Sequence, residues 1–326
     1  MKQYHLSVLL IYISIFNIGL LSAKEQKNAI IYMGDGGRIG DKLKGYYKTK
    51  WLSYKYKIPF FYSPFGKKYL TSKQFKLHKI ERPWSKKKKK RFKRHINLRK
   101  KHENEINFKP ETPTLYQFSY YTTITDNLLI KKLDKKFYNE HKVFFDRIRK
   151  LIKPVARIKQ ISLPDNKITV AVHVRKGGGF DKPLLSRKPN YQYEDVKWPT
   201  KFPPDSYYIE QIKYLSDYFD DSPLHVHIFT DDKNPARIMN KYKKAISLPN
   251  ITYSCRKKGN HHARNVLDDL FNMAYRFDCL IRPSSSFSYL AQLLGTHKLA
   301  IAPAKSVWQG NTLIITEASK FVNENV

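Results

Sequence analysis

Residues 168–179 read ITVAVHVRKGGG, and this stretch decides the fold. Its first seven residues form a β-branched run, as expected for a strand buried on both faces of a parallel sheet. Strand-like and helix-like patterns then alternate to the end of the chain. The further strands are expected at 224–229, 278–282 and 298–302, and the helices at 206–219, 234–242, 267–277 and 284–294. This alternation predicts a doubly wound α/β domain, with its ligand site at the carboxyl ends of the strands.

The beginning of the chain predicts a second α/β unit. An apolar strand is expected at 29–33, a glycine-rich loop at 34–41, a helix at 42–56 and another strand at 58–62. The loop does not match the dinucleotide fingerprint, so a plain structural turn explains it equally well. A connection rich in Pro and Asn at 152–165 predicts the boundary between an N-terminal domain, 27–152, and a C-terminal domain, 165–326.

The charge of the chain is large and uneven. The 326 residues carry a formal net charge of +35, and an unbroken cationic run, 86–91, lies within a basic insertion at 84–105. The simplest interpretation is a solvated loop. Residues 86–101 could also contact an anionic membrane surface or a polyanionic glycan. Nucleic acid is not an expected partner, because only Trp84 and Phe92 offer rings for stacking.

The N-terminus and the cysteines indicate the compartment. Residues 3–23 contain no Lys, Arg, Asp or Glu and end in small residues, which predicts a cleaved signal peptide or an uncleaved membrane anchor. We therefore expect a secretory-pathway or membrane-anchored protein, with secretion as an alternative. Two cysteines, Cys255 and Cys279, exclude a disulfide framework, and free thiols are expected rather than one bridge.

Polar side chains gather where the predicted strands end. His173 and Arg175 close the first strand, Asp231 and Asp232 follow the second, and Ser284–Ser286 follow the third. A guanidinium fork and a hydroxyl-rich helix N-terminus suit a diphosphate. Each feature has a plainer explanation: a surface arginine, a core histidine, or ordinary helix caps. Their shared position at the strand ends favours a phosphate site.

The order of these segments resembles that of fucosyltransferases. Residues 173–177, HVRKG, are similar to the family's His-x-Arg-Arg-x-Asp, and 229–232, FTDD, to its Phe-Ser-Asp-Asp. Residues 269–288 are similar to the segment that ends in Asn-Ser-Ser-Phe-Ser, and 297–308 to the closing Lys-x-Val-x-Ala-Pro-x-x-Trp. The likeness covers residues 168–308 and is greatest for the α-1,2-fucosyltransferases of glycosyltransferase family eleven.

The resemblance implies a fold of GT-B type, with two Rossmann-like domains facing a cleft. It also implies inverting, metal-independent transfer of fucose from GDP-fucose to a glycan hydroxyl, with no further cofactor. Arg175 and His173 would be the catalytic pair. The implied donor-binding residues are Asp231, Asp232, Asp268, Asp269, Ser284, Ser285, Ser286 and Phe287.

The chain departs from the family's pattern at one point. Gly177–Gly179 stand where an acidic residue usually follows the arginine. The general base is consequently open, and the candidates are Asp181, Asp35 and Asp41, because a carboxylate can take a proton from the acceptor hydroxyl. Three rival functions stay open: a metal-dependent transferase using Asp231 and Asp232, an inactive nucleotide-binding relative, and a non-catalytic protein that binds polyanions or membrane through its Lys-rich segment.

Overall fold

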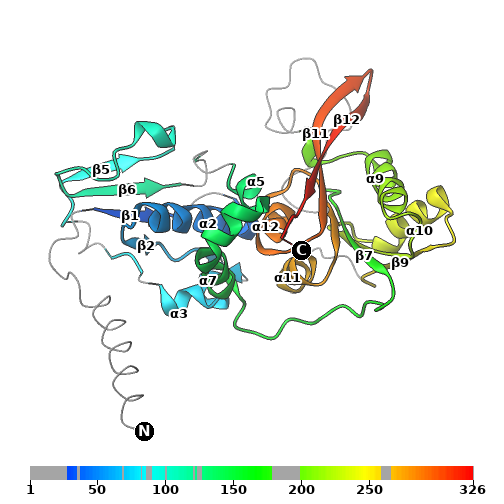
Figure 1. Ribbon diagram of the computed structural model, residues 1–326, viewed down its shortest axis with the longest axis horizontal. Helices are drawn as coiled ribbons and strands as arrows, with labels where there is room; N and C mark the ends of the chain where they lie inside the picture. Colours follow the sequence, from blue (N-terminus) through cyan, green and yellow to red (C-terminus); the bar gives the residue numbers. More distant parts are fainter. Residues whose placement is uncertain are drawn as a thin grey trace, which may run out of the picture. The chain divides into compact units, whose positions relative to one another are not determined.

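The computed structural model forms two α/β units (Figure 1). It describes residues 28–34, 37–67, 70–81, 83–85, 90–99, 101–119, 122, 127–177, 199–257 and 266–325. The first unit comprises the described residues of Met1–Gly34, Gly45–Pro64 and Glu81–Ile124, and the second comprises those of Asp35–Lys44, Phe65–Ile80 and Thr125–Val326. The second unit thus includes segments that precede the expected boundary at 152–165.

A parallel sheet of four strands is the centre of the first unit. Its order is β2-β1-β6-β5. The strands are β1 (Ala29–Tyr32), β2 (Phe60–Tyr62), β5 (Arg94–Asn97) and β6 (Thr114–Phe118), and helix α2 (Ile39–Tyr56) connects the first two. The strand–helix–strand order expected from the sequence is therefore present, and β5 and β6 complete the sheet.

Helix α2 packs closely on one face of this sheet. Gly45 allows that approach, because a Cβ atom there would lie 2.7 Å from the Tyr32 ring. Tyr46 meets Phe60 edge to face, with ring centroids 5.5 Å apart. The opposite face carries Ala29, Ile31 and Leu115.

The second unit contains a six-stranded sheet. Its order is β12-β11-β10-β7-β8-β9, with every pair parallel except β11–β12. The strands are β7 (Ile168–Val174), β8 (Leu224–Thr230), β9 (Ile251–Cys255), β10 (Cys279–Ile281), β11 (Leu299–Gln309) and β12 (Thr312–Val322). The main helices are α9 (Asp205–Tyr218), α10 (Pro235–Ile246), α11 (Val266–Tyr275) and α12 (Ser286–Leu294). The predicted α/β fold class with parallel sheets is confirmed.

Shorter elements complete the described chain. They are β3 (Gly66–Lys67), β4 (Leu70–Thr71), η1 (Ser72–Gln74), α3 (Leu77–Ile80), η2 (Glu103–Glu105), α5 (Leu128–Leu133), α6 (Lys135–Glu140), α7 (Lys142–Ile152) and η3 (Pro199–Lys201). The apolar spacing in the sequence from Asp134 to Leu151 predicts one amphipathic helix. The helix is interrupted, because His141 leaves the helical conformation with φ −116° and ψ 16°. Asp134 caps the first piece by accepting a 2.6 Å hydrogen bond from the Phe137 amide.

The cysteines are free, as expected. In the part of the chain that the structure describes, no helix is both long and apolar enough to cross a membrane. Residues 3–23, on which the signal-peptide and anchor predictions rest, lie outside the described residues. Those predictions and the expected localisation therefore stay as predictions.

Candidate functional site

Three neighbouring strands bring the candidate side chains together. In the sheet β10, β7 and β8 are adjacent and parallel, so their carboxyl ends lie side by side. Val174 is in register with Thr230, and Ile281 with Val172. The segments that begin at Arg175, Asp231 and Arg282 consequently leave the sheet at one edge, where ligands bind in open α/β sheets.

Asp231 shapes the turn that follows β7. Its Oδ1 accepts a 2.6 Å hydrogen bond from the Lys176 amide, and its Oδ2 accepts a 3.2 Å hydrogen bond from the Gly177 amide. Gly177 has a φ of +84°, a conformation that favours glycine. The glycine that departs from the family's pattern therefore belongs to a turn fixed by the predicted Asp231.

Asp205 holds the same turn through a lysine. Lys176 Nζ lies 2.5 Å from Asp205 Oδ1, Lys241 Nζ lies 2.7 Å from Oδ2, and the Tyr242 hydroxyl donates to Oδ1 at 2.8 Å. Burial alone would raise the pKa of the Asp205 carboxyl, but the hydrogen bonds from Lys176 and Lys241 outweigh it and lower that pKa to about 2. Sequence reasoning missed Asp205, because nothing marks it except its position at the start of α9.

Asp232 precedes helix α10, whose N-cap residue is Asn234. Its Oδ1 accepts a 2.8 Å hydrogen bond from the Asn234 amide, and its Oδ2 accepts a 3.0 Å hydrogen bond from Arg237 Nη2. Within the described residues no three His, Cys, Asp or Glu side chains form a cluster that could hold a metal ion. The two carboxylates of the metal-dependent alternative thus point at N–H donors of the chain itself.

His173 is a buried, neutral imidazole. Its ring centroid lies 5.7 Å from that of Phe287, and its Nδ1 has no hydrogen-bond partner among the described residues. Burial, with the nearby positive charges of Arg175 and Arg282, lowers its pKa to about 3. Arg175 itself lies over the Phe202 ring, 5.0 Å from the centroid. The structure therefore places His173, Arg175 and Phe287 close together.

Arg282 is a further cation that sequence reasoning did not select. It directly follows β10, its Nε donates to Gln292 Oε1 at 2.7 Å, and its Nη1 donates to the Pro283 carbonyl at 3.2 Å. Burial lowers its pKa to about 10, so it stays charged at neutral pH. Both of these hydrogen-bond partners, which belong to the part of the chain that the structure describes, are neutral, and a buried charge without a counter-charge is costly. An anionic ligand would remove that cost. The available sequence signal was an arginine at the end of the predicted strand 278–282.

The serine-rich segment begins a helix as predicted. Ser285 is the N-cap residue of α12, and its side chain makes no capping hydrogen bond. The start of α2 packs against this helix start, because a Cβ atom on Gly40 would lie 2.7 Å from the Phe287 backbone nitrogen. Two helix N-termini, each a positive dipole end, thus lie together. Sequence reasoning had treated these two segments separately.

Of the other predicted residues, Asp268 and Asp269 lie in the first turn of α11, and Asp41 lies in the first turn of α2, next to Gly40. Asp269 is buried in the first turn of α11 and pairs with Arg256, while Asp268 accepts a 3.0 Å hydrogen bond from the Lys159 amide. Asp41 caps its own helix by accepting from the Arg38 amide at 2.9 Å. Asp35 and Asp181 are outside the described residues. The predicted guanine contact and general base stay predictions.

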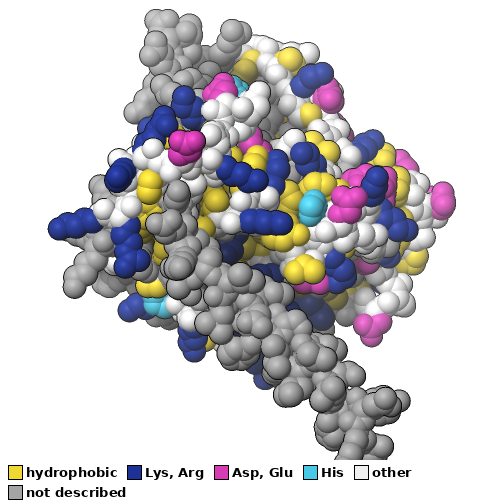
Figure 2. Space-filling view, turned by 60° about the vertical axis from the view of Figure 1, so that its left-hand side comes forward, with side chains coloured by type: hydrophobic (Ala, Val, Ile, Leu, Met, Phe, Trp, Pro, Cys, Tyr) yellow, Lys and Arg dark blue, Asp and Glu magenta, His cyan; other side chains and the backbone are white. Residues whose placement is uncertain are grey.

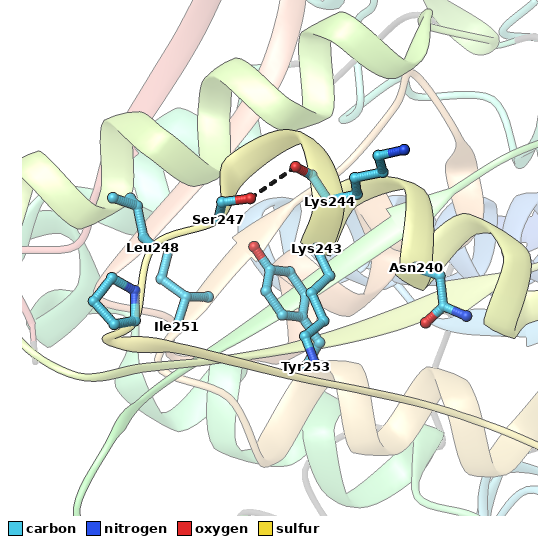
Figure 3. Close-up of a pocket in the computed structure, with 8 residues that line it drawn as sticks. Asn240, Lys243, Lys244, Ser247, Leu248, Ile251 and Tyr253 are labelled. Atoms are coloured by element: carbon cyan, nitrogen blue, oxygen red, sulfur yellow. Dashed lines mark hydrogen bonds between the residues drawn. The ribbon is translucent and has the colours of Figure 1, made fainter.

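A cavity of about 670 Å³ lies on the outer edge of the second unit. It is lined by residues from α10, from β9 and from the turn between them, among them Lys243, Leu248 and Tyr253 (Figure 3). Its walls belong to the C-terminal end of α10 and to edge strand β9, rather than to the ends of β10 and β7. It is therefore separate from the set of charged side chains described above.

Comparison with known proteins identifies the class of fold. A structure of a variant of Arabidopsis thaliana FUT1 in complex with GDP matches with a TM-score of 0.53 and 13% identity, over 86% of this chain and 71% of that one. POFUT1 in complex with GDP matches with a TM-score of 0.43 and 13% identity, over 84% and 96% of the two chains. Fucosyltransferase NodZ from Bradyrhizobium matches with a TM-score of 0.41 and 11% identity, over 91% and 99%.

The first match shows that the chain shares its fold with FUT1, which confirms the expected fold class of GT-B type. No protein-family model and no curated protein sequence matches the chain.

Proposed function

We propose that this chain is a metal-independent glycosyltransferase that moves fucose from GDP-fucose to a glycan hydroxyl with inversion, in the manner of α-1,2-fucosyltransferases. One observation carries the proposal. Arg175, buried Arg282 and two helix N-termini gather beside the carboxyl ends of β7 and β10, in a fold shared with a protein that binds GDP. This set suits a nucleoside diphosphate.

The chemistry follows from that arrangement. The acceptor oxygen forms a bond to the anomeric carbon of the donor, and the bond from that carbon to the diphosphate oxygen breaks. The diphosphate leaves with the electron pair, and its growing negative charge needs fixed positive groups. Arg175, Arg282 and the helix N-termini supply them without reorganisation. The acceptor proton passes to a carboxylate, for which Asp41, Asp35 and Asp181 are the candidates.

Neutral His173 has a compatible role. Because burial and two arginines hold its pKa at about 3, it adds no charge to the site at neutral pH. An uncharged imidazole can accept or donate one hydrogen bond through its unpartnered Nδ1, depending on its tautomer. We infer that it lines the donor site and orients a donor hydroxyl or a phosphate oxygen.

Calorimetric titration of the full chain tests the donor assignment. GDP, GDP-fucose, GDP-mannose and UDP-galactose are compared with EDTA present. We expect binding of GDP and GDP-fucose, strong weakening by Arg175→Ala, and no change with Arg276→Ala, an exposed arginine on the loop after α11. A folded sample that binds none of these nucleotides would refute the proposal.

A second candidate function, nucleotide binding without transfer, is favoured by the turn at Gly177. The Gly177 turn replaces the usual acidic residue, which favours a chain that binds the nucleotide and transfers nothing. Release of GDP from GDP-fucose, measured with a panel of glycan acceptors, separates the two functions. Donor binding together with acceptor-dependent GDP release supports transfer, whereas binding without release under any acceptor supports the inactive alternative.

A further inference from the structure

One edge of the first unit, the end of its sheet where the strands begin, carries Asn28 and a group of cations. Asn28, the first described residue, accepts a 3.0 Å hydrogen bond from the Thr114 amide. Thr114 is in register with Arg94 in β5, and the Lys93 amide donates to the Pro113 carbonyl at 3.0 Å. Because neighbouring strands lie about 4.8 Å apart, the starts of β1 and β5 are separated by roughly 10 Å.

The sheet face next to this edge carries aromatic rings. Ala29, Ile31 and Leu115 form a small apolar cluster there, on which Phe61, Trp84 and Phe92 pack. The Trp84 ring lies 5.7 Å from that of Phe61 and 6.4 Å from that of Phe92. Trp84 and Phe92 are half-buried, so each ring also presents a surface to solvent.

Exposed cations flank Phe92 in the sequence. Lys90, Arg91, Lys93 and Arg94 are all exposed, and Phe92 lies among them in the sequence. Figure 2 shows Lys and Arg side chains distributed widely over one face of the molecule, with hydrophobic side chains visible between them. Half-buried Trp and Phe rings bordered by Lys and Arg are the composition of surfaces that rest at the headgroup level of a bilayer.

We propose that this basic edge, Lys90–Arg94 with the Trp84 and Phe92 rings, docks on an anionic phospholipid surface. The cations would contact lipid phosphates and carboxylates, and the rings would enter the interface. The apolar stretch 3–23 ends five residues before Asn28. Five peptide units span at most about 18 Å, so a bilayer holding that stretch would lie next to this edge.

A membrane bound at the basic edge would leave the opposite end of the four-stranded sheet uncovered by lipid. All four strands of the first unit are parallel, so the basic edge lies at their amino ends. In α/β folds ligands enter at the carboxyl ends. The chain would thus be held to the membrane by an edge that substrate binding does not use.

The experiment measures contact between Trp84 and lipid. The full chain is reconstituted from detergent into vesicles containing brominated phosphatidylcholine, with or without phosphatidylserine. The Trp84 contribution to quenching is the difference from Trp84→Phe, because the chain has four tryptophans. We expect quenching of Trp84 in phosphatidylserine vesicles, and its loss at high salt.

A matched pair of triple variants tests the cations. Lys90→Gln/Arg91→Gln/Lys93→Gln removes three charges at the edge, and Lys213→Gln/Lys243→Gln/Lys244→Gln removes three exposed charges from the second unit. Each basic side chain near an anionic surface contributes roughly five-fold, so the first variant should lower the ratio of docked to undocked protein about 100-fold. The second variant should leave it unchanged.

Three outcomes would overturn the proposal: Trp84 is unquenched, it is quenched equally in neutral vesicles, or the two triple variants behave alike. Retention on heparin or RNA that depends on the edge, without a difference between vesicle types, would assign the edge to a polyanion instead. Thermal unfolding of each variant confirms that the comparison is between folded proteins.

Discussion

At the scale of single residues, charge is the most informative feature of the second unit. Arg175 and Arg282 lie close enough to His173 to lower its pKa, yet Arg282 makes its hydrogen bonds to neutral groups. Tyr289 and Phe321 cover its guanidinium, at 5.3 and 5.9 Å from their ring centroids. A buried cation of this kind is tolerated where a ligand supplies the missing negative charge.

The first prediction concerns Arg282. Replacing it with Met keeps the apolar length and removes the charge, so GDP should bind about 10- to 100-fold more weakly, the loss of one charge-assisted hydrogen bond. Stability without ligand should stay similar or rise, because the buried charge is gone. Calorimetry and urea unfolding measure the two effects. Weaker binding in Arg276→Ala as well, or unchanged binding in Arg282→Met, would contradict the role.

The second prediction concerns His173 and pH. Its folded pKa of about 3 is below the ordinary histidine value of 6.5, so the unfolded state binds a proton more readily. The contribution of His173 to the unfolding free energy is therefore complete above pH 6.5 and decreases as the pH falls toward 3. His173→Gln should reduce the slope of unfolding free energy against pH by up to about 1.4 kcal/mol per unit in this window. Urea unfolding at several pH values measures it, and identical slopes would refute it.

At the scale of elements, the contact between two helix starts is the feature that sequence reasoning lacked. The glycine loop and the serine triplet each carried a weak signal, and they lie about 250 residues apart in the chain. Nothing local indicates that they meet, because the contact depends on tertiary packing at Gly40. The positions of the strands along the chain could be predicted, since buried β-branched runs are local patterns.

The ends of one predicted helix and one predicted strand differ from those in the structure. The predicted helix 134–151 had the right apolar spacing, but the interruption at His141 does not change that spacing. The last strand was expected to end at residue 302, whereas β11 continues to Gln309 and pairs with β12. The turn residues Gly310 and Asn311 between apolar runs were an available hairpin signal.

The third prediction tests the helix contact. In Gly40→Ala the new Cβ would meet Phe287 backbone at 2.7 Å, so the two helix starts must move apart. We expect a loss of about 1–3 kcal/mol in unfolding free energy and weaker GDP binding. Gly310→Ala is the control, because its φ of +59° makes it strained while nothing lies within 4 Å. It should lower stability without changing GDP affinity, and equal binding losses would argue against the contact.

At the scale of the whole molecule, the net charge of +35 and the buried site act differently on an anionic ligand. Exposed cations raise the local concentration of anions and speed their association, and salt screens them. Arg282 is buried and is screened much less. The affinity for GDP therefore has a salt-sensitive part from the surface and a salt-resistant part from the site.

The fourth prediction follows from that division. Between about 0.01 and 0.15 M salt the Debye length falls from about 30 to 8 Å, so GDP affinity should drop several-fold and then level off. In Arg282→Met the GDP affinity that remains at high salt should be lower by the 10- to 100-fold expected for this residue. The salt-sensitive part of the affinity should be unchanged. Titrations at stepped ionic strength measure both parts. An affinity that keeps falling with salt in the unmodified chain would mean that surface charge alone binds GDP, and the strand-end site would then have no special role.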